Sequence, residues 1–430
     1  MADLASMQRY ESYKDSGVDW LGDIPSGWNL LPLKYKLKFH TGGTPSSGSA
    51  SFYNGDLPWV TISDLDGRQT RKTHYLSKAG VRAANIPLSP KNSLLYSFKL
   101  SIGQVAFSHV DLYTNEAIAS FIPDDGINLN YYFYALPTFL EHNAEVNIYG
   151  AKLLNQSRIS NAAILDISEA EQTAIANFLD KKTLQIDEAI AIKEKQIELL
   201  KERKQILIQE SVTKGLDIKV SLKNTELSWA PQVASHWSLL PNRVFLKMRR
   251  VPVGLAHEKY QLLSLTKRGV LVRDLSKGAG KQSDFLERMQ EVREGDLIFC
   301  LFDVEETPRT VGFSEHLGMI SADYTIFECI DEPTGRFLEY FYKSMDDQKS
   351  LKPLYKGLRK RIPKPKFLRT NCPMPPKDEL LKIIQFLDQV EVDTTNSIEI
   401  ILSQIEKLKE YKATLIYSAV TGKIKVPGGG

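Results

Sequence analysis

The feature that most constrains this 430-residue chain is an internal duplication. Residues 196–213 and 404–421 are identical at eleven of eighteen positions, at a constant offset of 208 residues. Upstream, two tryptophans and a Leu-Leu-Pro segment recur at an offset of 209: Trp20, Trp28 and 30–32 return as Trp229, Trp237 and 239–241. Heptad patterning would reproduce apolar positions, but not Gln, Glu, Lys and Trp as well. The chain is therefore predicted to be a tandem duplication.

The best-matched parts of the duplication have the pattern of long helices. Apolar residues recur at steps of three, four or seven through 169–214 and 377–421, and neither segment contains Pro or Gly. Sustained heptads with charged flanks indicate a coiled coil. The alternative is two amphipathic helices, each packed on its own domain. Gly215 and Gly422 follow the helical segments, as C-capping glycines would.

The segments between the repeats, 40–165 and 249–376, show little resemblance to each other. Each has short β-branched and aromatic runs bounded by turn residues, which predicts two mixed α/β domains in a chain of the α+β class. The predicted order is an N-terminal segment at 1–39, a first domain at 40–165, a central helix at 166–216, a linker with a repeat of the N-terminal segment at 217–248, a second domain at 249–376 and a C-terminal helix at 377–424.

Motifs for catalysis are missing from the sequence. The seven histidines have no metal-ligand spacing, and no Asn/Asp-Pro-Pro-aromatic tetrapeptide of base methyltransferases occurs. Three widely spaced cysteines, Cys300, Cys329 and Cys372, fit a reducing cytoplasm. No run of about 18 apolar residues occurs, and the N-terminal residues do not resemble a secretory signal. We therefore expect a cytoplasmic protein that is not itself an enzyme.

Positive charge is concentrated in the second domain. Residues 40–165 contain 9 basic and 9 acidic residues, whereas 249–376 contain 22 and 18. Within the second domain, 352–369 holds eight basic residues and no acidic one, interleaved with Tyr355 and Phe367. This pattern is typical of a surface that follows nucleic-acid phosphates, although a solvated basic loop has the same composition.

Several short motifs, in their order and spacing, resemble the specificity subunits of type I restriction-modification enzymes. The opening residues 13–17, 20–25 and 27–28 are similar to the start of that family, and Gly42-Gly43-Thr44-Pro45-Ser46 to the start of its first target-recognition domain. Segments 58–60, 63–65 and 114–119 are similar to motifs inside that domain. Glu171-Gln172 with Ile175 resembles the entry to the family's central helix. In the second half, Ser321-Ala322-Asp323-Tyr324 stands where the Thr-Asn motif of 114–119 would be.

The resemblance implies a DNA-recognition subunit without catalysis of its own. Each target-recognition domain would read one half of a bipartite double-stranded DNA site. The two helices would pack antiparallel, set the spacer between the half-sites and dock two methyltransferase subunits, which a restriction and translocase subunit would join. S-adenosylmethionine, ATP and magnesium would belong to those partners, with no cofactor on this chain. The alternative functions are a coiled-coil interaction scaffold that does not bind DNA, and an enzyme with an unrecognised site.

The candidate DNA contacts are basic or hydroxyl side chains of the two variable domains. In the first domain they are Thr44, Ser47, Arg68, Arg71, Lys72, Lys152 and Arg158. In the second domain they are Arg249, Arg250, Lys267, Arg268, Lys281, Lys356, Arg359, Lys360 and Arg361.

Overall fold

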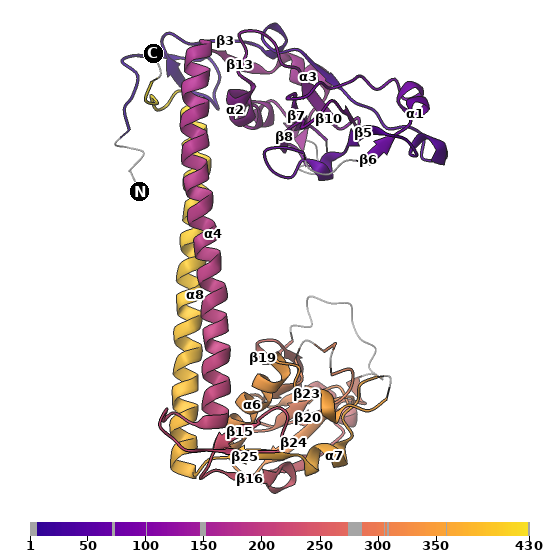
Figure 1. The fold of residues 1–430 in the computed structure, drawn as a ribbon, viewed down its shortest axis with the longest axis vertical. Helices are drawn as coiled ribbons and strands as arrows, with labels where there is room; N and C mark the ends of the chain where they lie inside the picture. Colours follow the sequence, from indigo (N-terminus) through magenta and orange to yellow (C-terminus); the bar gives the residue numbers. More distant parts are fainter. Residues whose placement is uncertain are drawn as a thin grey trace. The chain divides into compact units, whose positions relative to one another are not determined.

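The computed structural model describes residues 7–70, 74–99, 101–146, 152–273, 286–304, 306–307, 309–357 and 359–428. The chain divides into two compact units. Unit 1 comprises residues 1–192 and 403–430, and unit 2 comprises residues 193–402. Each unit therefore combines one variable domain with part of both long helices (Figure 1).

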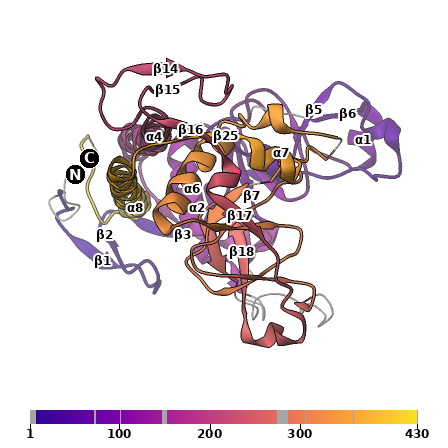
Figure 2. The same cartoon turned by 90° about the horizontal axis from the view of Figure 1, so that it is seen from below.

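Two long helices, α4 (Glu169–Lys214) and α8 (Lys377–Val420), follow the predicted segments closely. They pack together, as Figure 1 and the end-on view in Figure 2 show. In unit 1, Lys412 Nζ of α8 lies 2.7 Å from Asp187 of α4. In unit 2, Lys204 Nζ of α4 lies 3.3 Å from Glu391 of α8. The C-terminal part of α8 contacts the N-terminal part of α4, and the C-terminal part of α4 contacts the N-terminal part of α8. The two helices are therefore antiparallel. The coiled-coil prediction is confirmed, and the alternative of separately packed helices is wrong.

Each long helix ends at a glycine packed against a duplicated tryptophan. Gly215 and Gly422 adopt φ angles of +84° and +73°, the left-handed region that disfavours other residues. A Cβ on Gly422 would lie 2.6 Å from the Trp28 ring, so the close approach also requires glycine. The indole of Trp28 donates to Glu171 of α4 at 3.0 Å, and that of Trp237 donates to Glu379 of α8 at 3.1 Å. In each unit the tryptophan thus joins the end of one helix to the start of the other.

The variable domain of unit 1 contains two small sheets. The larger sheet has the order β4-β10-β7-β8, with all neighbours antiparallel. Its strands are β4 (Phe39–Thr41), β10 (Ile118–Phe121), β7 (Leu94–Ser97) and β8 (Val105–Phe107). The smaller sheet, β6-β5-β9, consists of β6 (His74–Leu76), β5 (Leu57–Val60) and β9 (Tyr113–Thr114), with β5 and β9 parallel. Helix α2 (Leu129–His142) packs on the larger sheet.

The variable domain of unit 2 repeats this topology with one additional strand, β20, in its smaller sheet. Its larger sheet, β17-β24-β21-β22, consists of β17 (Leu246–Arg249), β24 (Thr325–Cys329), β21 (Leu297–Phe299) and β22 (Val311–Phe313). Its smaller sheet, β19-β18-β23-β20, consists of β19 (Gly269–Val272), β18 (Gln261–Thr266), β23 (Gly318–Ile320) and β20 (Gln290–Val292). Here β18 and β23 are the parallel pair. Helix α6 (Glu332–Asp347) takes the place of α2.

Alternation of side chains along the strands explains how each domain holds its layers together. Leu94 and Tyr96 of β7 join the core under α2, whereas Leu95 joins a separate cluster between the two sheets. In unit 2, Leu297 and Phe299 of β21 pack under α6, whereas Ile298 lies between the sheets. Neighbouring residues of a strand face opposite sides, so each central strand serves two apolar layers.

Short elements connect the domains to the helices. In unit 1 these are β1 (Tyr13–Asp15), β2 (Asp23–Pro25), β3 (Asn29–Pro32), β11 (Glu145–Val146), β12 (Lys152–Leu153), α3 (Gln156–Asn161) and β13 (Ala163–Asp166). Helix α1 (Lys78–Ala83) lies inside the variable domain of unit 1, next to β6. In unit 2 they are β14 (Leu222–Asn224), β15 (Gln232–Ala234), β16 (Ser238–Pro241), α7 (Lys364–Arg369) and β25 (Asn371–Met374). The strand before α4 is β13, and it pairs with β3. The strand before α8 is β25, and it pairs with β16. No described helix is both long and apolar enough to cross a membrane.

Candidate nucleic-acid interface

In unit 1, three sequence motifs meet where β4 and the parallel strands β5 and β9 end. Gly43 N donates to Thr114 O at 2.9 Å, and Trp59 Nε1 donates to Gly43 O at 3.2 Å. Asn115 N donates to Val60 O at 3.0 Å. We call the surface formed by residues 42–47, 61–64 and 114–117 the loop edge of unit 1.

Glycine is required at the centre of this loop edge. A Cβ on Gly42 would lie 1.9 Å from the carbonyl oxygen of Thr114, so any other residue would force the two segments apart. This contact brings Thr44 within reach of the next turn, where its hydroxyl donates to the carboxylate of Glu116. That hydrogen bond is the main cause of a lowered pKa of Glu116.

The equivalent surface of unit 2 follows from strand register. Gln261 of β18 pairs with Gly318 of β23 in parallel, so the two strands start together, and β18 continues past the end of β23 to the turn at 266–268. Arg249 of β17 pairs with Ile326 of β24, which places Arg250 beside the turn that enters β24. We call the surface formed by residues 250–251 and 321–324, together with the β18–β19 turn at 266–268, the loop edge of unit 2.

A basic hairpin adjoins the loop edge of unit 2. Lys356 and Arg361 exchange two backbone hydrogen bonds of 2.8 and 3.0 Å, and Lys360 has a φ of +44° in the turn between them. The carboxylate of Asp303 forms an ion pair with Arg359 at 3.0 Å. The backbone N–H of Asp303 donates a hydrogen bond to the backbone carbonyl of Arg359. The ring of Phe302 lies 6.3 Å from the ring of Tyr324 of the loop edge, and the two ring planes are tilted by 59°. The hairpin thus lies next to the loop edge through segment 302–303.

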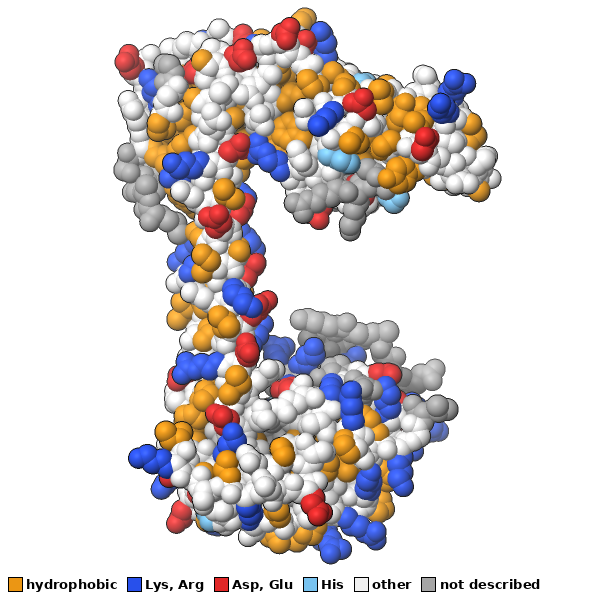
Figure 3. All heavy atoms as spheres, in the orientation of Figure 1, with side chains coloured by type: hydrophobic (Ala, Val, Ile, Leu, Met, Phe, Trp, Pro, Cys, Tyr) orange, Lys and Arg blue, Asp and Glu red, His pale blue; other side chains and the backbone are white. Residues whose placement is uncertain are grey.

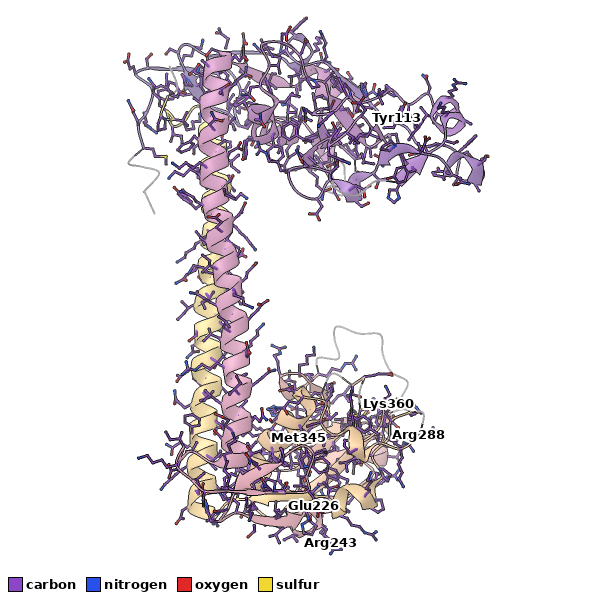
Figure 4. The ribbon with its side chains drawn as sticks, viewed as in Figure 1. Tyr113, Glu226, Arg243, Arg288, Met345 and Lys360 are labelled. Atoms are coloured by element: carbon purple, nitrogen blue, oxygen red, sulfur yellow. The ribbon has the colours of Figure 1, made fainter. Side chains whose placement is uncertain are left out.

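Positive charge is visibly denser on unit 2. Figure 3 shows more Lys and Arg side chains on this face of unit 2 than on unit 1. Lys360 of the hairpin lies on the side of its domain away from the two long helices (Figure 4). In unit 1, Tyr113 of β9 likewise lies on the side away from the helices (Figure 4). Each unit therefore directs these strands and loops outward.

Nine of the predicted DNA contacts lie on the loop edge of their own unit or on the hairpin of unit 2. The exposed Thr44 and Ser47 lie on the loop edge of unit 1. The exposed Arg250, Lys267 and Arg268 lie on the loop edge of unit 2. The hairpin supplies the remaining four, which are Lys356, Arg359, Lys360 and Arg361. Contact of these residues with DNA stays a prediction. Arg71, Lys72 and Lys281 lie outside the described residues.

Arg249 requires a correction. Its side chain is only 11% exposed and forms ion pairs with Glu291 at 3.0 Å and with Asp296. Burial raises the pKa of Asp296, whereas the hydrogen bond from the Arg293 backbone and the charge of Arg249 lower it. Since both carboxylates are buried, Arg249 neutralises them and holds β17 against its neighbours. It is not a surface contact.

The other predicted residues of unit 1 that the structure describes are engaged in ion pairs. Lys152 pairs with Glu141, and Arg158 pairs with Glu145. Arg68 donates to Asp180 of α4 at 2.6 and 3.0 Å and lies over the ring of Phe133. These contacts give Arg68 a role in joining the domain to the helix, which the sequence did not suggest.

Arg68 belongs to a clamp that both units possess. In unit 1, Tyr134 of α2 donates to Asp180 at 2.6 Å beside the Arg68 guanidinium. In unit 2, Tyr340 and Arg336 of α6 both donate to Asp388 of α8, at 2.7 and 2.8 Å. Asp180 and Asp388 occupy equivalent positions of the duplication. We call these the Asp180 clamp and the Asp388 clamp. Only their aspartates lie in the repeated sequence.

Two acidic residues of the loop edges were missed by sequence reasoning, which searched for cations. Glu116 and Asp323 are exposed and lie in the turns that enter β10 and β24. The available signal was the motif alignment itself, since 114–119 and 321–324 occupy the same place in the two halves. Among the described residues, no group of three or more His, Cys, Asp or Glu side chains could hold a metal ion.

The sequence is similar to those of known specificity subunits. The family described as the type I restriction modification DNA specificity domain matches residues 25–202. The type I restriction enzyme MjaIX specificity subunit of Methanocaldococcus jannaschii is 28% identical over 187 residues, 42% of this chain and 42% of that protein. The HindI specificity subunit of Haemophilus influenzae is 26% identical over 169 residues, 38% of this chain and 36% of that protein. The matched segment therefore spans less than half the length of these relatives.

Solved structures share the fold of nearly the whole chain. A chain from a type I restriction-modification system, whose complex assembly and conformational transition were studied, superposes with a TM-score of 0.67 at 12% identity. The match covers 92% of this chain and 98% of that one. The HsdS subunit of Thermoanaerobacter tengcongensis gives a TM-score of 0.52 at 12% identity, covering 93% and 98%.

Proposed function

We propose that the chain is a specificity subunit of a type I restriction-modification system and that it recognises a bipartite double-stranded DNA sequence through its two loop edges. The observation that supports this most directly is the repetition of the loop edge, with one topology and two different sets of side chains. Two equivalent surfaces with different chemistry suit a site whose two halves differ in sequence.

The side chains of unit 2 suit both components of DNA binding. Arg250, Lys267 and Arg268 are long cationic side chains on one edge, and the neighbouring hairpin adds Lys356 and Arg361. Cations that contact phosphates provide affinity and register, whereas side chains that reach base edges provide specificity. Unit 1 offers mainly hydroxyl and carboxyl groups on its loop edge. We therefore assign a larger share of non-specific affinity to unit 2.

The helix pair is the proposed platform for partners. Exposed apolar residues follow α4 at steps of eight, seven and seven residues: Leu184, Ile192, Leu199 and Ile206. Such a stripe on a helix surface suits a partner helix, since large exposed apolar patches usually mark interaction sites. The duplication then offers two similar surfaces, which suits two methyltransferase subunits, joined by a restriction and translocase subunit.

The chemistry of the complex is assigned to those partners. On this proposal the chain performs no catalytic step and holds no cofactor. S-adenosylmethionine belongs to the methyltransferase, and ATP with magnesium belongs to the restriction subunit. As the family resemblance implies, helix length sets the spacer between half-sites, and the complex works in the cytoplasm.

A domain exchange tests the proposal. Residues 40–165 are replaced by the corresponding domain of another family member, the chain is co-expressed with its methyltransferase, and methylated adenines are mapped across the genome. We expect one half-site to change while the other half-site and the spacer stay the same. A change in both half-sites, or in neither, would refute separate reading by the two units.

The rival function, a coiled-coil scaffold without DNA recognition, makes a different prediction. A gel-shift measurement on the complex with the methyltransferase would then show no preference for the mapped site over scrambled DNA. A purified chain that cleaved DNA with magnesium alone would instead favour an enzyme.

A further inference from the structure

Each loop edge carries one exposed carboxylate at the same topological position. Glu116 follows β9 and precedes β10, and Asp323 follows β23 and precedes β24. In both units this turn connects the smaller sheet to the larger one, and β10 and β24 are the second strands of their sheets. The two domains have little sequence in common, yet both carry an exposed acidic side chain in this turn.

Both carboxylates are held in place by hydroxyl groups. Thr44 donates to Glu116, and the packing of Gly42 on Thr114 fixes the distance between their segments. In unit 2, Ser321 Oγ donates to Asp323 Oδ2 at 3.2 Å. The hydrogen bond from Thr44 favours the charged form of Glu116 and lowers its pKa. These side chains are positioned acceptors.

Neither carboxylate serves as the partner of a cation. Among the described residues, no Lys, Arg or His nitrogen lies within 4 Å of Glu116 or Asp323. This distinguishes them from Asp303, Glu141 and Glu145, which all form ion pairs. The charge of Lys99 contributes to the lowered pKa of Glu116 from beyond ion-pair distance, so no ion pair accounts for either carboxylate.

Carboxylates also oppose the non-specific part of DNA binding. Arg250, Lys267 and Arg268 belong to the same loop edge as Asp323, and their positive charges attract phosphates. The negative charge of Asp323 is repelled by the phosphates. A carboxylate on such a surface contributes to binding only where it accepts a hydrogen bond from the DNA. The donors that double-stranded DNA offers in the major groove are the amino groups of cytosine N4 and adenine N6.

From this geometry, and resting on the function proposed above, we propose that Glu116 and Asp323 are specificity-determining residues, each accepting a hydrogen bond from the amino group of a cytosine or adenine in its half-site. Thr44 is the positioning residue of Glu116. The two carboxylates thus select a base pair in each half-site and lower affinity for all other sequences.

The test uses isosteric amides in the intact complex with the methyltransferase. Glu116→Gln and Asp323→Asn are compared with Asp124→Asn as a matched control. Asp124 follows β10 at the end opposite Glu116 and forms an ion pair with Lys38 at 2.7 Å. The preferred sites of each variant are selected from a randomised DNA library, and affinity is measured for cognate and scrambled duplexes.

We expect Glu116→Gln to relax the preference at one base pair of the unit 1 half-site and to weaken cognate binding by about 5- to 150-fold. Affinity for scrambled DNA should stay the same or rise, since a repelled charge is removed. Asp323→Asn should do the same in the other half-site, and Asp124→Asn should change neither. Uniform loss of affinity for all DNA, or unchanged base preference, would overturn the assignment.

The domain exchange separates this inference from the proposed function. If exchanging residues 40–165 redirects one half-site while Glu116→Gln leaves the preferred bases unchanged, the carboxylate assignment fails and the function stands. If the exchange also has no effect, the function fails. Hydrogen exchange on each variant confirms that the strands β10 and β24 remain folded.

Discussion

The two variable domains share a topology without sharing a recognisable sequence. Ile118, Leu95 and Val60 lie between the two sheets in unit 1, and Ile326, Ile298 and Leu263 fill the corresponding layer in unit 2. These positions require only apolar side chains of suitable volume, a condition that many sequences meet. Their loop edges, in contrast, differ in chemistry, with hydroxyl groups in unit 1 and arginine or lysine in unit 2. The comparison teaches that a fixed scaffold can carry different surfaces.

The parts that join domain to helix follow a stricter rule. Asp180 and Asp388 are retained by the duplication, whereas the arginines that bind them come from different elements, a loop in unit 1 and α6 in unit 2. Each variable domain has thus reached the same attachment through a different residue. A domain exchanged into this chain must supply a tyrosine and an arginine at the helix aspartate.

The largest effects should come from the duplicated tryptophans, where the two units are most alike. Trp28→Ala and Trp237→Ala should each lower the free energy of unfolding of their own unit by about 3–5 kcal/mol, since both side chains are almost fully buried. Denaturation followed by hydrogen exchange in α2 and α6 measures this. Trp28→Phe and Trp237→Phe should lower the free energy of unfolding less, because an aromatic ring remains and the main loss is the hydrogen bond from the indole N–H to the glutamate. A large loss of stability in only one unit would show that the two tryptophans are not equivalent.

Next in size are the clamps, where the units should differ. Asp388→Ala should cost about 1–3 kcal/mol and Asp180→Ala less, because Arg336 is 26% exposed and Arg68 is 40% exposed. The protection of α6 and α2 amides against hydrogen exchange reports each loss. Glu188→Ala, an exposed acidic site on α4, is the control and should have little effect. Equal losses at both aspartates would show that burial of the arginine does not matter.

The third prediction concerns the charge difference between the loop edges. Replacing Lys267 and Arg268 by Gln should reduce the steepness of the logarithmic salt dependence of DNA binding by about 1.8, or 0.9 for each phosphate contact. Replacing Lys152 and Arg158 in unit 1 should leave it unchanged, since both are engaged with glutamates. Affinity is titrated against salt concentration in the methyltransferase complex. If replacing Lys152 and Arg158 also reduced the slope of the salt dependence, the two units would not differ in their phosphate contacts.

The smallest effect distinguishes the helix caps. Asp331 caps α6 and Asn128 caps α2. Hydrogen bonds from Thr334 lower the pKa of Asp331 below its unfolded value of about 3.8. Its stabilisation is therefore present above about pH 4 and is lost as pH falls through the folded pKa. Asn128 cannot titrate.

Replacement of the cap measures this contribution. Asp331→Ala should cost about 1 kcal/mol at neutral pH, and Asp331→Asn much less. Unfolding of unit 2 as a function of pH should show an acid-dependent loss in the parent that Asp331→Asn lacks. An identical pH profile in both proteins would mean that the charge of the cap contributes nothing.

Local patterns in the sequence were sufficient for the helices and their glycine caps, because heptads and breakers act within a few turns. The shared topology of the domains could not be read in the same way. Their strands are mostly three or four residues long, and their pairing depends on contacts between distant segments. Arg249 illustrates the limit, since its partners Glu291 and Asp296 lie more than forty residues away. Likewise Arg68 meets Asp180 across 112 residues.

The composition of unit 1 from both ends of the chain has a consequence for biosynthesis. Ile186 and its neighbours on α4 pack against residues such as Leu408 and Leu415, which are translated more than two hundred residues later. At about 5–20 residues per second, the ribosome needs roughly 10 to 45 seconds to supply them. During that interval the apolar seam of α4 is made but uncovered, so the nascent chain is a natural client for chaperones, and the pace of translation bears on its yield.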